Sequence, residues 1–405
     1  MYLTTEEQDM LAGGQGKATR KAMQILVALG TIYAAEQMLP VTSVQIAGVS
    51  YDNLGEPGLQ FLQEMAEGGG QARVLTTLNP AGMDVENWES LGISPEFASS
   101  QRRVLDTFAR MGVLTTCTCT PYLVGNLPHF GQHLAWAESS AVCFANSVIG
   151  ARTNREGGPS ALASALTGRT PAYGFHLDHE RQPSLCVEVT ASLEACGEWD
   201  ESLVFGALGK AIGKTSPESS LPPVPFIRGV SRVSLEGLKA FCASLATYTG
   251  SALFHLEGIT PEAGSLKPPV DVIQIGENEI NLALDSMTDA TPEEVDFVSL
   301  GCPHLTIREI ARLAELLNGK RVKKEFWITT ARPTKFLADR LGLSRTIEDS
   351  GAKFAVDTCC VVAPIQGRFN ALATDSAKAC YYAGAKNGFK TLVKSFDDVV
   401  REALQ

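Results

Sequence analysis

The sequence predicts a mixed α/β protein with mostly parallel sheets. Short strand-like runs alternate with helical patterns along much of the chain, an order that is typical of β–α units. At 405 residues the chain exceeds what one hydrophobic core usually supports, so we expect two or three domains. Three cysteine-containing turns each directly follow a run that resembles a buried strand, and ligands gather at the carboxyl ends of such strands. We therefore expect a metal site at a sheet edge.

The N-terminal region is predicted to be helical before this alternation begins. Thr4, followed by Glu6 and Glu7, is typical of a helix N-cap with an acidic first turn, and residues 18–37 have an alanine-rich amphipathic pattern. The pattern then changes to alternating elements: strands at 44–49 and 74–78, and helices at 59–66 and 96–111. We assign residues 1–160 to a first α/β domain, which carries the first cysteine turn and a glycine-flanked polar loop.

The C-terminal third has the clearest pattern. Strands are predicted at 297–300, 325–329 and 354–356, with helices at 307–317 and 333–341 between them. This order is typical of a doubly wound α/β unit, which we assign to a domain at 286–405 with the other two cysteine turns. Residues 161–285 form the remaining predicted α/β domain. Within it, the Ser/Pro-rich segment 214–225 is typical of a linker or a loop at a domain edge.

Composition argues against nucleic-acid and membrane partners. The net charge is −11, and no Lys/Arg-rich block is present. No uninterrupted apolar stretch reaches the roughly 18 residues of a membrane span, and the N-terminus has neither a basic region nor an apolar signal core. Ten cysteines in a chain without an export signal are more typical of thiols and metal ligands than of a disulfide framework. We therefore expect a cytoplasmic protein that binds no nucleic acid and no membrane.

The three cysteine turns are Thr118–Pro121 with Cys119, Gly301–His304 with Cys302, and Asp357–Cys360 with Cys359. Single cysteines on distant segments suit an iron–sulfur cluster in which three irons have thiolate ligands and one stays open to substrate. An open iron is a Lewis acid and could help a hydroxyl group leave as water. The alternative is that a thiol is simply a small buried apolar group. That alternative is expected for the cysteines inside apolar runs or an ordinary loop: Cys143, Cys186, Cys196 and Cys242.

Zinc is the competing metal for these turns. Structural zinc sites usually contain a Cys-x-x-Cys pair, and the chain has none. Two of the turns have a second cysteine close by, Cys117 in one case and Cys360 in the other. Since neighbouring side chains in extended backbone point to opposite sides, only one cysteine of each pair is expected to face the site. We predict Cys119 and Cys359, which lie nearer the turns.

A second set of polar residues is predicted to handle an anionic substrate. Arg152 and Arg155 lie in the glycine-flanked loop, and a guanidinium group can bind a carboxylate or phosphate with two hydrogen bonds. A lone arginine more often forms a surface ion pair, and a solvated helix surface is the alternative for Lys378. The predicted substrate-binding residues are Thr76, Asn79, Arg152, Asn154, Arg155 and Lys378, and the predicted catalytic residues are Glu138, Ser139, His255 and Glu257.

Together these motifs resemble the large subunit of the aconitase X family. The resemblance is carried by Thr76-Thr77-Leu78-Asn79-Pro80, Cys117-Thr118-Cys119-Thr120-Pro121-Tyr122, Glu138-Ser139-Ser140-Ala141, the loop from Gly150 to Gly158, His255-Leu256-Glu257-Gly258, Gly301-Cys302-Pro303-His304 and Asp357-Thr358-Cys359. It implies an aconitase-like fold of three α/β domains around a central cluster site. It also implies an iron–sulfur cofactor, foremost [4Fe-4S], bound by Cys119, Cys302 and Cys359, and a dehydratase that acts on a small anionic hydroxy acid.

The resemblance further implies a partner chain. In this superfamily a small swivelling domain carries the serine that acts as base, either fused to the large chain or on a separate small subunit. Because this chain ends at Gln405, we expect a separate small subunit, as in the archaeal type of the family. That type dehydrates (R)-5-phosphomevalonate to trans-anhydromevalonate 5-phosphate in a modified mevalonate pathway, which is the activity we expect. The alternative is the reaction of the fused bacterial type, which dehydrates cis-3-hydroxy-L-proline.

Three points stay open at this stage. Gln45 stands where the family resemblance predicts a histidine, so no role is carried to that position. Three cysteines could also hold a two-iron cluster or a single iron. A non-catalytic iron–sulfur binding protein is an alternative of another class, although the retained polar residues Glu138, Ser139, Asn154 and Arg155 argue against it.

Overall fold

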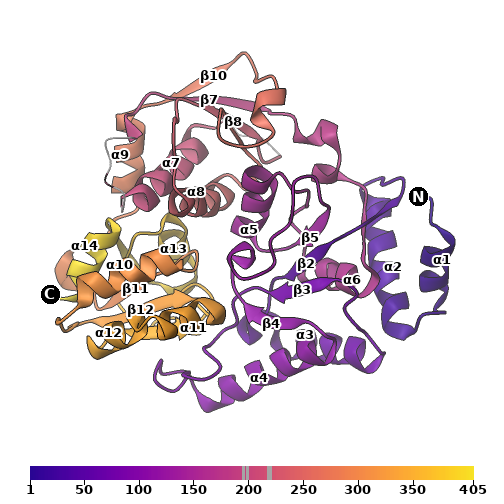
Figure 1. The fold of residues 1–405 in the computed structure, drawn as a ribbon, viewed down its shortest axis with the longest axis horizontal. Coiled ribbons are helices and arrows are strands. Elements are labelled where there is room, and N and C mark those ends of the chain that lie inside the picture. The colour runs from indigo at the N-terminus through magenta and orange to yellow at the C-terminus, as the bar shows by residue number, and fades with distance from the viewer. Residues whose placement is uncertain (194–196, 198–199, 217–220) are drawn as a thin grey trace.

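Among its described residues, the computed structural model contains three parallel β-sheets, each with helices against it, and a two-stranded antiparallel sheet (Figure 1). The structure describes residues 1–193, 197, 200–216 and 221–405. Cys196 and residues 217–220 of the predicted edge loop lie outside the described residues. The predicted fold class, α/β with mostly parallel sheets, is confirmed. In the described part of the chain, no helix is long and apolar enough to cross a membrane.

Two helices form the N-terminal region: α1 (Thr5–Ala12) and α2 (Lys17–Ile32). Thr4 caps α1, because its hydroxyl accepts a hydrogen bond from the Glu7 N–H at 3.3 Å and the Glu7 carboxylate accepts one from the Thr4 N–H at 2.8 Å. The sequence pattern predicted that the second helix ends at residue 37, whereas α2 ends at Ile32. Ala34 adopts a left-handed conformation with φ 54°, and the chain then enters β1 (Met38–Pro40), which pairs with β6 (Arg169–Pro171).

The first parallel sheet has the strand order β4-β3-β2-β5. Its strands are β2 (Ser43–Ile46), β3 (Leu75–Leu78), β4 (Leu114–Cys117) and β5 (Leu134–Trp136), and its helices are α3 (Tyr51–Glu67), α4 (Pro95–Arg110), α5 (Ser139–Phe144) and α6 (Gly158–Thr167). All neighbouring strands are parallel, so their carboxyl ends meet at one edge. Cys119 follows β4 and Glu138 follows β5, which places both at this edge.

The second sheet has the order β10-β7-β8-β9. Its strands are β7 (Leu185–Val189), β8 (Pro225–Arg228), β9 (His255–Leu256) and β10 (Val272–Ile275), and its helices are α7 (Glu201–Thr215), α8 (Leu235–Tyr248) and α9 (Glu277–Asp285). The buried side chains of α7 and α8 share one core with those of α5 and with Ala377 and Cys380 of α13 (Ala377–Tyr382). The helices of the second sheet therefore support helices that belong to the other two.

The third sheet has the order β13-β12-β11-β14-β15. Its strands are β11 (Phe297–Leu300), β12 (Glu325–Thr330), β13 (Lys353–Val356), β14 (Ala371–Thr374) and β15 (Lys390–Val393), and its further helices are α10 (Ile307–Leu317), α11 (Arg332–Arg340), α12 (Leu343–Asp349) and α14 (Phe396–Ala403). The predicted strand–helix order from residue 297 to 356 is confirmed, with ends that differ by one residue at most.

The three sheets share one strand order over their first four strands in the chain. In each sheet the second and third strands lie on one side of the first strand, and the fourth strand lies on the other side. This reversal is a topological switch point, at which a crevice opens beyond the carboxyl ends of the strands. The order places Cys302 and Lys378 beside the switch point of the third sheet, since they follow β11 and β14.

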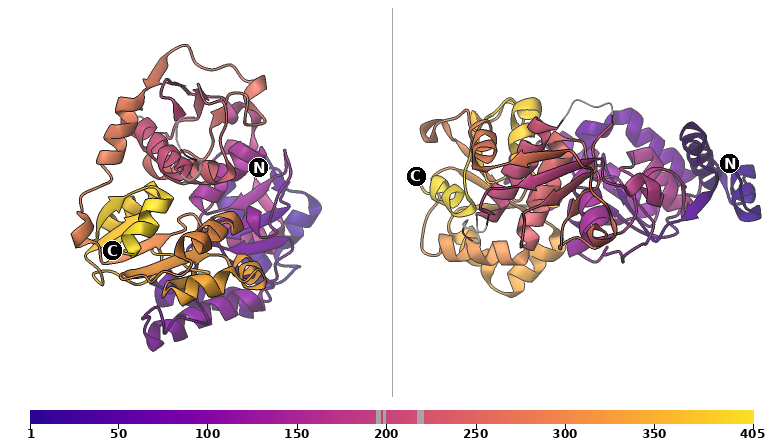
Figure 2. Two further views of the ribbon diagram at one scale, coloured as in Figure 1. Left: turned by 60° about the vertical axis from the view of Figure 1, so that its left-hand side comes forward. Right: turned by 90° about the horizontal axis from the view of Figure 1, so that it is seen from above.

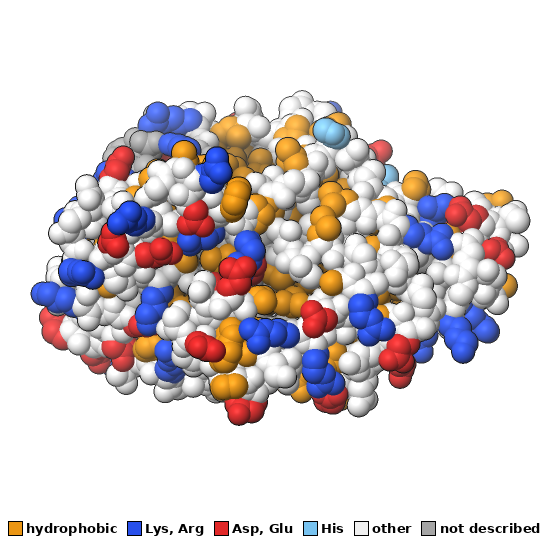
Figure 3. Space-filling model, turned by 60° about the horizontal axis from the view of Figure 1, so that its bottom comes forward, with side chains coloured by type: hydrophobic (Ala, Val, Ile, Leu, Met, Phe, Trp, Pro, Cys, Tyr) orange, Lys and Arg blue, Asp and Glu red, His pale blue; other side chains and the backbone are white. Residues whose placement is uncertain are grey.

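The face of the molecule that Figure 3 shows is mixed in charge. Lys and Arg side chains alternate with Asp and Glu on the face that Figure 3 shows, and no extended basic patch is visible there. The two termini lie at opposite ends of the molecule when it is seen from above (Figure 2).

Candidate active site

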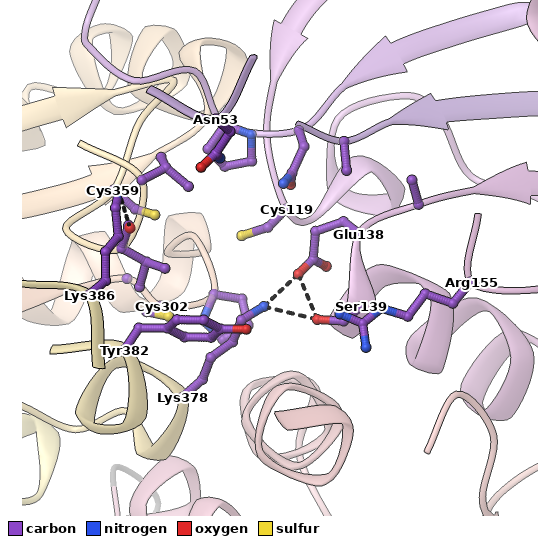
Figure 4. A pocket seen from close by; sticks show the side chains of 18 residues that line it. Asn53, Cys119, Glu138, Ser139, Arg155, Cys302, Cys359, Lys378, Tyr382 and Lys386 are labelled. Atoms are coloured by element: carbon purple, nitrogen blue, oxygen red, sulfur yellow. Dashed lines mark hydrogen bonds and ion pairs between the residues drawn. The ribbon is translucent and has the colours of Figure 1, made fainter. Parts of the chain in front are cut away.

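A cavity of about 240 Å³ lies where the carboxyl edges of the first and third sheets meet (Figure 4). Its lining comes from the segments that follow β2, β3, β4 and β5 on one side, and β11, β13 and β14 on the other. Eight residues predicted from sequence line it: Asn79, Cys119, Glu138, Ser139, Arg155, Cys302, Cys359 and Lys378. The fold thus brings together side chains that are up to 299 positions apart, as between Asn79 and Lys378.

Three cysteines face this cavity from separate segments. Cys119 and Cys359 are buried, and Cys302 is partly exposed. Burial raises the pKa of all three thiols, that of Cys302 to about 12, so without a metal each keeps its proton at neutral pH. A metal would have to displace these protons on binding. Within the described residues, no group of three His, Cys, Asp or Glu side chains is placed to hold one metal ion.

The neighbouring cysteines point elsewhere. Cys117 belongs to the hydrophobic core of the first sheet, and Cys360 belongs to a core beneath the third sheet. Neither lines the cavity. Cys143 and Cys242 are fully buried in the core that α5 shares with α8. The structure therefore gives Cys119, Cys302 and Cys359 a common environment that these other thiols lack.

Glu138 and Lys378 form a buried ion pair across the cavity. Lys378 Nζ lies 2.5 Å from Glu138 Oε1, and the carboxylate also accepts hydrogen bonds from the Ser140 hydroxyl and the Ala141 N–H, each at 2.6 Å. Burial opposes ionisation of Glu138, but Lys378 and these hydrogen bonds outweigh it and lower its pKa. Burial likewise opposes the charge on Lys378, and the Glu138 carboxylate outweighs it, so the pKa of Lys378 is raised. Both groups are therefore charged at neutral pH.

Local backbone structure fixes this pair. Glu138 is the N-cap of α5, and Ser376 is the N-cap of α13, whose first turn carries Lys378. Capping groups at these positions satisfy N–H groups that the helix leaves unpaired. Two helix ends, one from each sheet, thus aim their side chains into the same space.

Other polar groups on the lining are available to a ligand. Arg155 is exposed and forms no hydrogen bond or ion pair with any described residue. Asn79 Oδ1 is buried and has no hydrogen-bond partner among the described residues. Because Glu138 already balances the charge of Lys378, Arg155 supplies positive charge that no other described residue of the cavity neutralises. The site suits an anionic ligand with at least one further polar group.

Three lining residues were missed by the sequence reasoning: Asn53, Tyr382 and Lys386. Lys378, Tyr382 and Lys386 are spaced by four, which puts them on one face of α13 and the π-helix that continues it, Ala383–Asn387. That spacing would have pointed to Tyr382 and Lys386 once Lys378 had been chosen. Lys386 donates a hydrogen bond to the Val361 carbonyl at 3.0 Å.

Five predicted site residues lie outside the lining, and their roles stay predictions. Thr76 is buried in β3 and its hydroxyl donates to the Val74 carbonyl at 3.0 Å. Arg152 forms an ion pair with Asp178. The amide of Asn154 holds a turn, donating to the Tyr173 carbonyl at 3.0 Å; it lines a larger neighbouring cavity of about 850 Å³, which also reaches Arg155.

The other two lie on the second sheet. His255 is buried and its Nε2 lies 2.8 Å from the carbonyl oxygen of Arg181. Burial lowers the pKa of His255. Glu257 is exposed, with Oε1 3.6 Å from Nε of Arg228. Glu257 follows β9, the strand position after which the other two sheets carry cysteine turns, whereas His255 lies within β9.

Gln45 supports the first cysteine turn. It is fully buried on β2, and its side-chain amide donates a hydrogen bond to the Thr118 carbonyl at 2.8 Å. Its Oε1 has no partner in the described part of the structure. Gln45, which stands where a histidine was expected, thus contacts the first cysteine turn and does not line the cavity.

Comparison with known proteins agrees with this arrangement. Three family models match, described as the aconitase X first domain over residues 1–179, second domain over 183–285 and third domain over 295–405. A relative from Methanosarcina mazei named phosphomevalonate dehydratase large subunit is 43% identical over 100% of this chain and 97% of its own length. Another of that name from Methanocaldococcus jannaschii is 42% identical over 94% of this chain and 95% of its own length.

A solved structure is also similar. The holo-form of Thermococcus kodakaraensis aconitase X superposes with a TM-score of 0.89, is 40% identical and covers 100% of both chains. More distantly, a cis-3-hydroxy-L-proline dehydratase from Hypocrea jecorina is 34% identical over 95% of this chain and 66% of its own length. By these full-length matches and by the arrangement of its cavity, the chain belongs to the aconitase X family.

Proposed function

We propose that this chain is the large subunit of a phosphomevalonate dehydratase, a cytoplasmic hydro-lyase of a modified mevalonate pathway. It would remove water from (R)-5-phosphomevalonate to give trans-anhydromevalonate 5-phosphate. The observation that carries the proposal is the near-complete match, at over 40% identity, to archaeal relatives of that name. The matches named cis-3-hydroxy-L-proline dehydratase are more distant, which makes that activity the second candidate.

The residues of the cavity fit an iron–sulfur cofactor. Cys119, Cys302 and Cys359 would hold it, foremost as a [4Fe-4S] cluster, because single thiolates from separate segments can each bind a different iron. When bound, the cluster supplies a Lewis acid that polarises the hydroxyl group that is lost.

The protein residues would bind the two ends of the substrate. Arg155, exposed and without a partner among the described residues, is the group that we assign to the phosphate. Lys378, held charged by Glu138, would bind the carboxylate deeper in the cavity. Asn79, with its unpaired Oδ1, would accept a hydrogen bond from the substrate hydroxyl. Glu138 and Ser139 would keep Lys378 in place rather than remove the proton from carbon.

A small partner subunit would complete the site. The printed names of the archaeal relatives describe a large subunit, which implies a small one in those proteins. For this chain we propose a small subunit with a swivelling domain whose serine removes the proton from the carbon next to the hydroxyl-bearing one. The proton and the hydroxyl would then leave as water.

The decisive experiment is an assay of the two-subunit complex, prepared without oxygen, on both candidate substrates. We expect turnover of 5-phosphomevalonate, little of cis-3-hydroxy-L-proline, and loss of colour and turnover in Cys302→Ser. Arg155→Gln is expected to raise KM for 5-phosphomevalonate with a smaller change in kcat. Turnover of hydroxyproline alone would favour the second candidate, and a coloured complex without any turnover would favour a non-catalytic iron–sulfur protein.

A further inference from the structure

We propose that His304 is a positioning residue that ties the three cysteine turns together at the spacing a cluster needs. The inference rests on the proposed function, because it concerns the same three cysteines. It adds a residue that lies outside the cavity lining and acts through the cysteine turns.

Each polar group of His304 reaches a different partner. Its backbone N–H donates to Cys119 Sγ at 3.2 Å, and its ring Nδ1 lies 3.0 Å from Thr118 Oγ1, so both contacts reach the first turn. Ring Nε2 lies 2.9 Å from the carbonyl oxygen of Thr358, in the third turn. The His304 carbonyl accepts a hydrogen bond from Lys239 Nζ at 2.9 Å. Because His304 itself belongs to the second turn, one residue joins all three.

These contacts are the direct hydrogen bonds between the turns. For Thr118–Pro121, Gly301–His304 and Asp357–Cys360, which are all described, every hydrogen bond from one turn to another involves His304. His304 therefore adds direct hydrogen bonds between the three turns to the strand pairing that already joins β11, β12 and β13.

The hydrogen bonds also determine the protonation of the ring. A carbonyl oxygen can only accept, so the bond to Thr358 requires the proton on Nε2. Nδ1 is then the acceptor, and the Thr118 hydroxyl donates to it. The ring is fully buried. An imidazole with both nitrogens bonded is a rigid spacer between the first and third turns.

A helix of the second sheet contacts the backbone of His304. Lys239 lies on α8, is buried, and pairs with Glu309 at 2.6 Å while it donates to the His304 carbonyl. The same Glu309 carboxylate accepts a hydrogen bond from the Thr306 N–H at 2.7 Å. The turn that contains Cys302 is thereby fixed to a helix of the second sheet.

The test uses variants that remove one ring contact at a time. His304→Gln keeps a donor near the Nε2 position and loses the acceptor for Thr118, and His304→Asn does the reverse. Thr118→Val removes the hydroxyl partner alone. Groups that orient metal ligands typically contribute about 10- to 100-fold to metal affinity, so we expect each variant to lose iron to a chelator at least about 10-fold faster than the wild type. The readouts are iron and sulfide per chain after anaerobic reconstitution, visible absorbance during chelation, and the Tm of the apo chain.

A double variant and a control make the result specific. Thr118→Val is expected to add little to His304→Gln, because the contact is already lost there. His176→Gln changes another buried histidine, which pairs with His133 at 3.0 Å and touches no cysteine turn, and it should keep the wild-type rate of iron loss. Equal rates in the wild type and Thr118→Val would overturn the inference, as would equally fast loss in His176→Gln. A wild-type chain that takes up no cluster would contradict the proposed function instead.

Discussion

The first and third sheets meet at the cavity, whereas the second sheet, built with the same strand order, does not. The third strand of each sheet shows the difference. In the first and third sheets it leads to Cys119 and Cys359, which line the cavity. In the second sheet it leads to Glu257, which is exposed and lies 3.6 Å from Arg228. Equivalent positions in equivalent sheets thus acquire different environments from the way the sheets are packed.

The helices that follow the fourth strand extend this comparison. In the first sheet α5 leads into the π-helix Ala145–Ile149 and ends at Gly150; in the third, α13 leads into the π-helix Ala383–Asn387 and ends at Gly388. Both final glycines have positive φ. The two caps differ, because Glu138 supplies a carboxylate and Ser376 a hydroxyl. One helix end is therefore anionic and receives its cation, Lys378, from the other.

The largest effect is expected from substituting the cysteines that distinguish the first and third sheets from the second. Cys119→Ser or Cys359→Ser should abolish cluster binding and turnover of the complex, because each removes one of three proposed iron ligands. Cys186→Ala, a buried thiol on β7 of the second sheet, is the matched control and should keep both. Iron and sulfide content with steady-state rates would measure this. Full iron content in Cys119→Ser would contradict the assignment.

The ion pair between the first and third sheets gives the next effect. Glu138→Gln should lower the free energy of unfolding of the apo chain by about 3–5 kcal/mol, because it leaves the buried Lys378 charge uncompensated. Adding Lys378→Met should recover part of that loss. Urea unfolding of both variants measures the coupling. If the losses in unfolding free energy from Glu138→Gln and Lys378→Met simply add in the double variant, the ion pair does not stabilise the contact between the two sheets.

The loop after the π-helix distinguishes the first sheet from the third, and its Glu156 predicts a pH dependence. Burial raises the pKa of Glu156 from 4.5 to about 7, although the Ser160 hydroxyl donates to it. Between pH 4.5 and 7 the unfolded chain releases this proton while the folded chain keeps it, so stability falls as pH rises. Glu156→Gln should therefore gain about 3 kcal/mol in unfolding free energy at pH 8 and little at pH 4.5. Equal gains at both pH values would refute this explanation.

The smallest effect tests the support from the second sheet. A Cβ at Gly209 on α7 would lie 2.8 Å from the backbone nitrogen of Leu245 on α8, so Gly209→Ala must push these helices apart. We expect a loss of about 1–3 kcal/mol in unfolding free energy, measured by urea titration of the apo chain. Gly264→Ala, with nothing within 4 Å of its added Cβ, is the control and should change stability far less.

Sequence patterns predicted local structure better than contacts between the sheets. The strands and helices from 297 to 356 were predicted because their hydrophobic periods are regular and their turns are short. The cysteine turns could be placed at sheet edges by the rule for parallel strands, and the structure puts Cys119, Cys302 and Cys359 on one cavity. That rule refers to a single sheet, so it does not tell which sheet edges face the cavity, and the edge with Glu257 does not.

The features of the site that the sequence did not predict depend on tertiary packing. Asn53 lies at the start of α3, and nothing in its neighbours distinguishes it from a solvated helix end. The ion pair of Glu138 with Lys378 joins residues 240 positions apart, and no local pattern links them. In the sequence His304 is part of a short cysteine motif. Its proposed positioning role depends on hydrogen bonds to residues that are 186 and 54 positions away.

The order of synthesis gives the three cysteines a further meaning. They stand at positions 119, 302 and 359 of a 405-residue chain and reach one cavity only after the first and third sheets have docked. A nascent or truncated chain that stops before residue 359 can offer at most two of these thiols. If the three cysteines bind the proposed cluster, its loading is a late step of maturation, which would spare the cell from placing iron and sulfide in chains that have not finished folding.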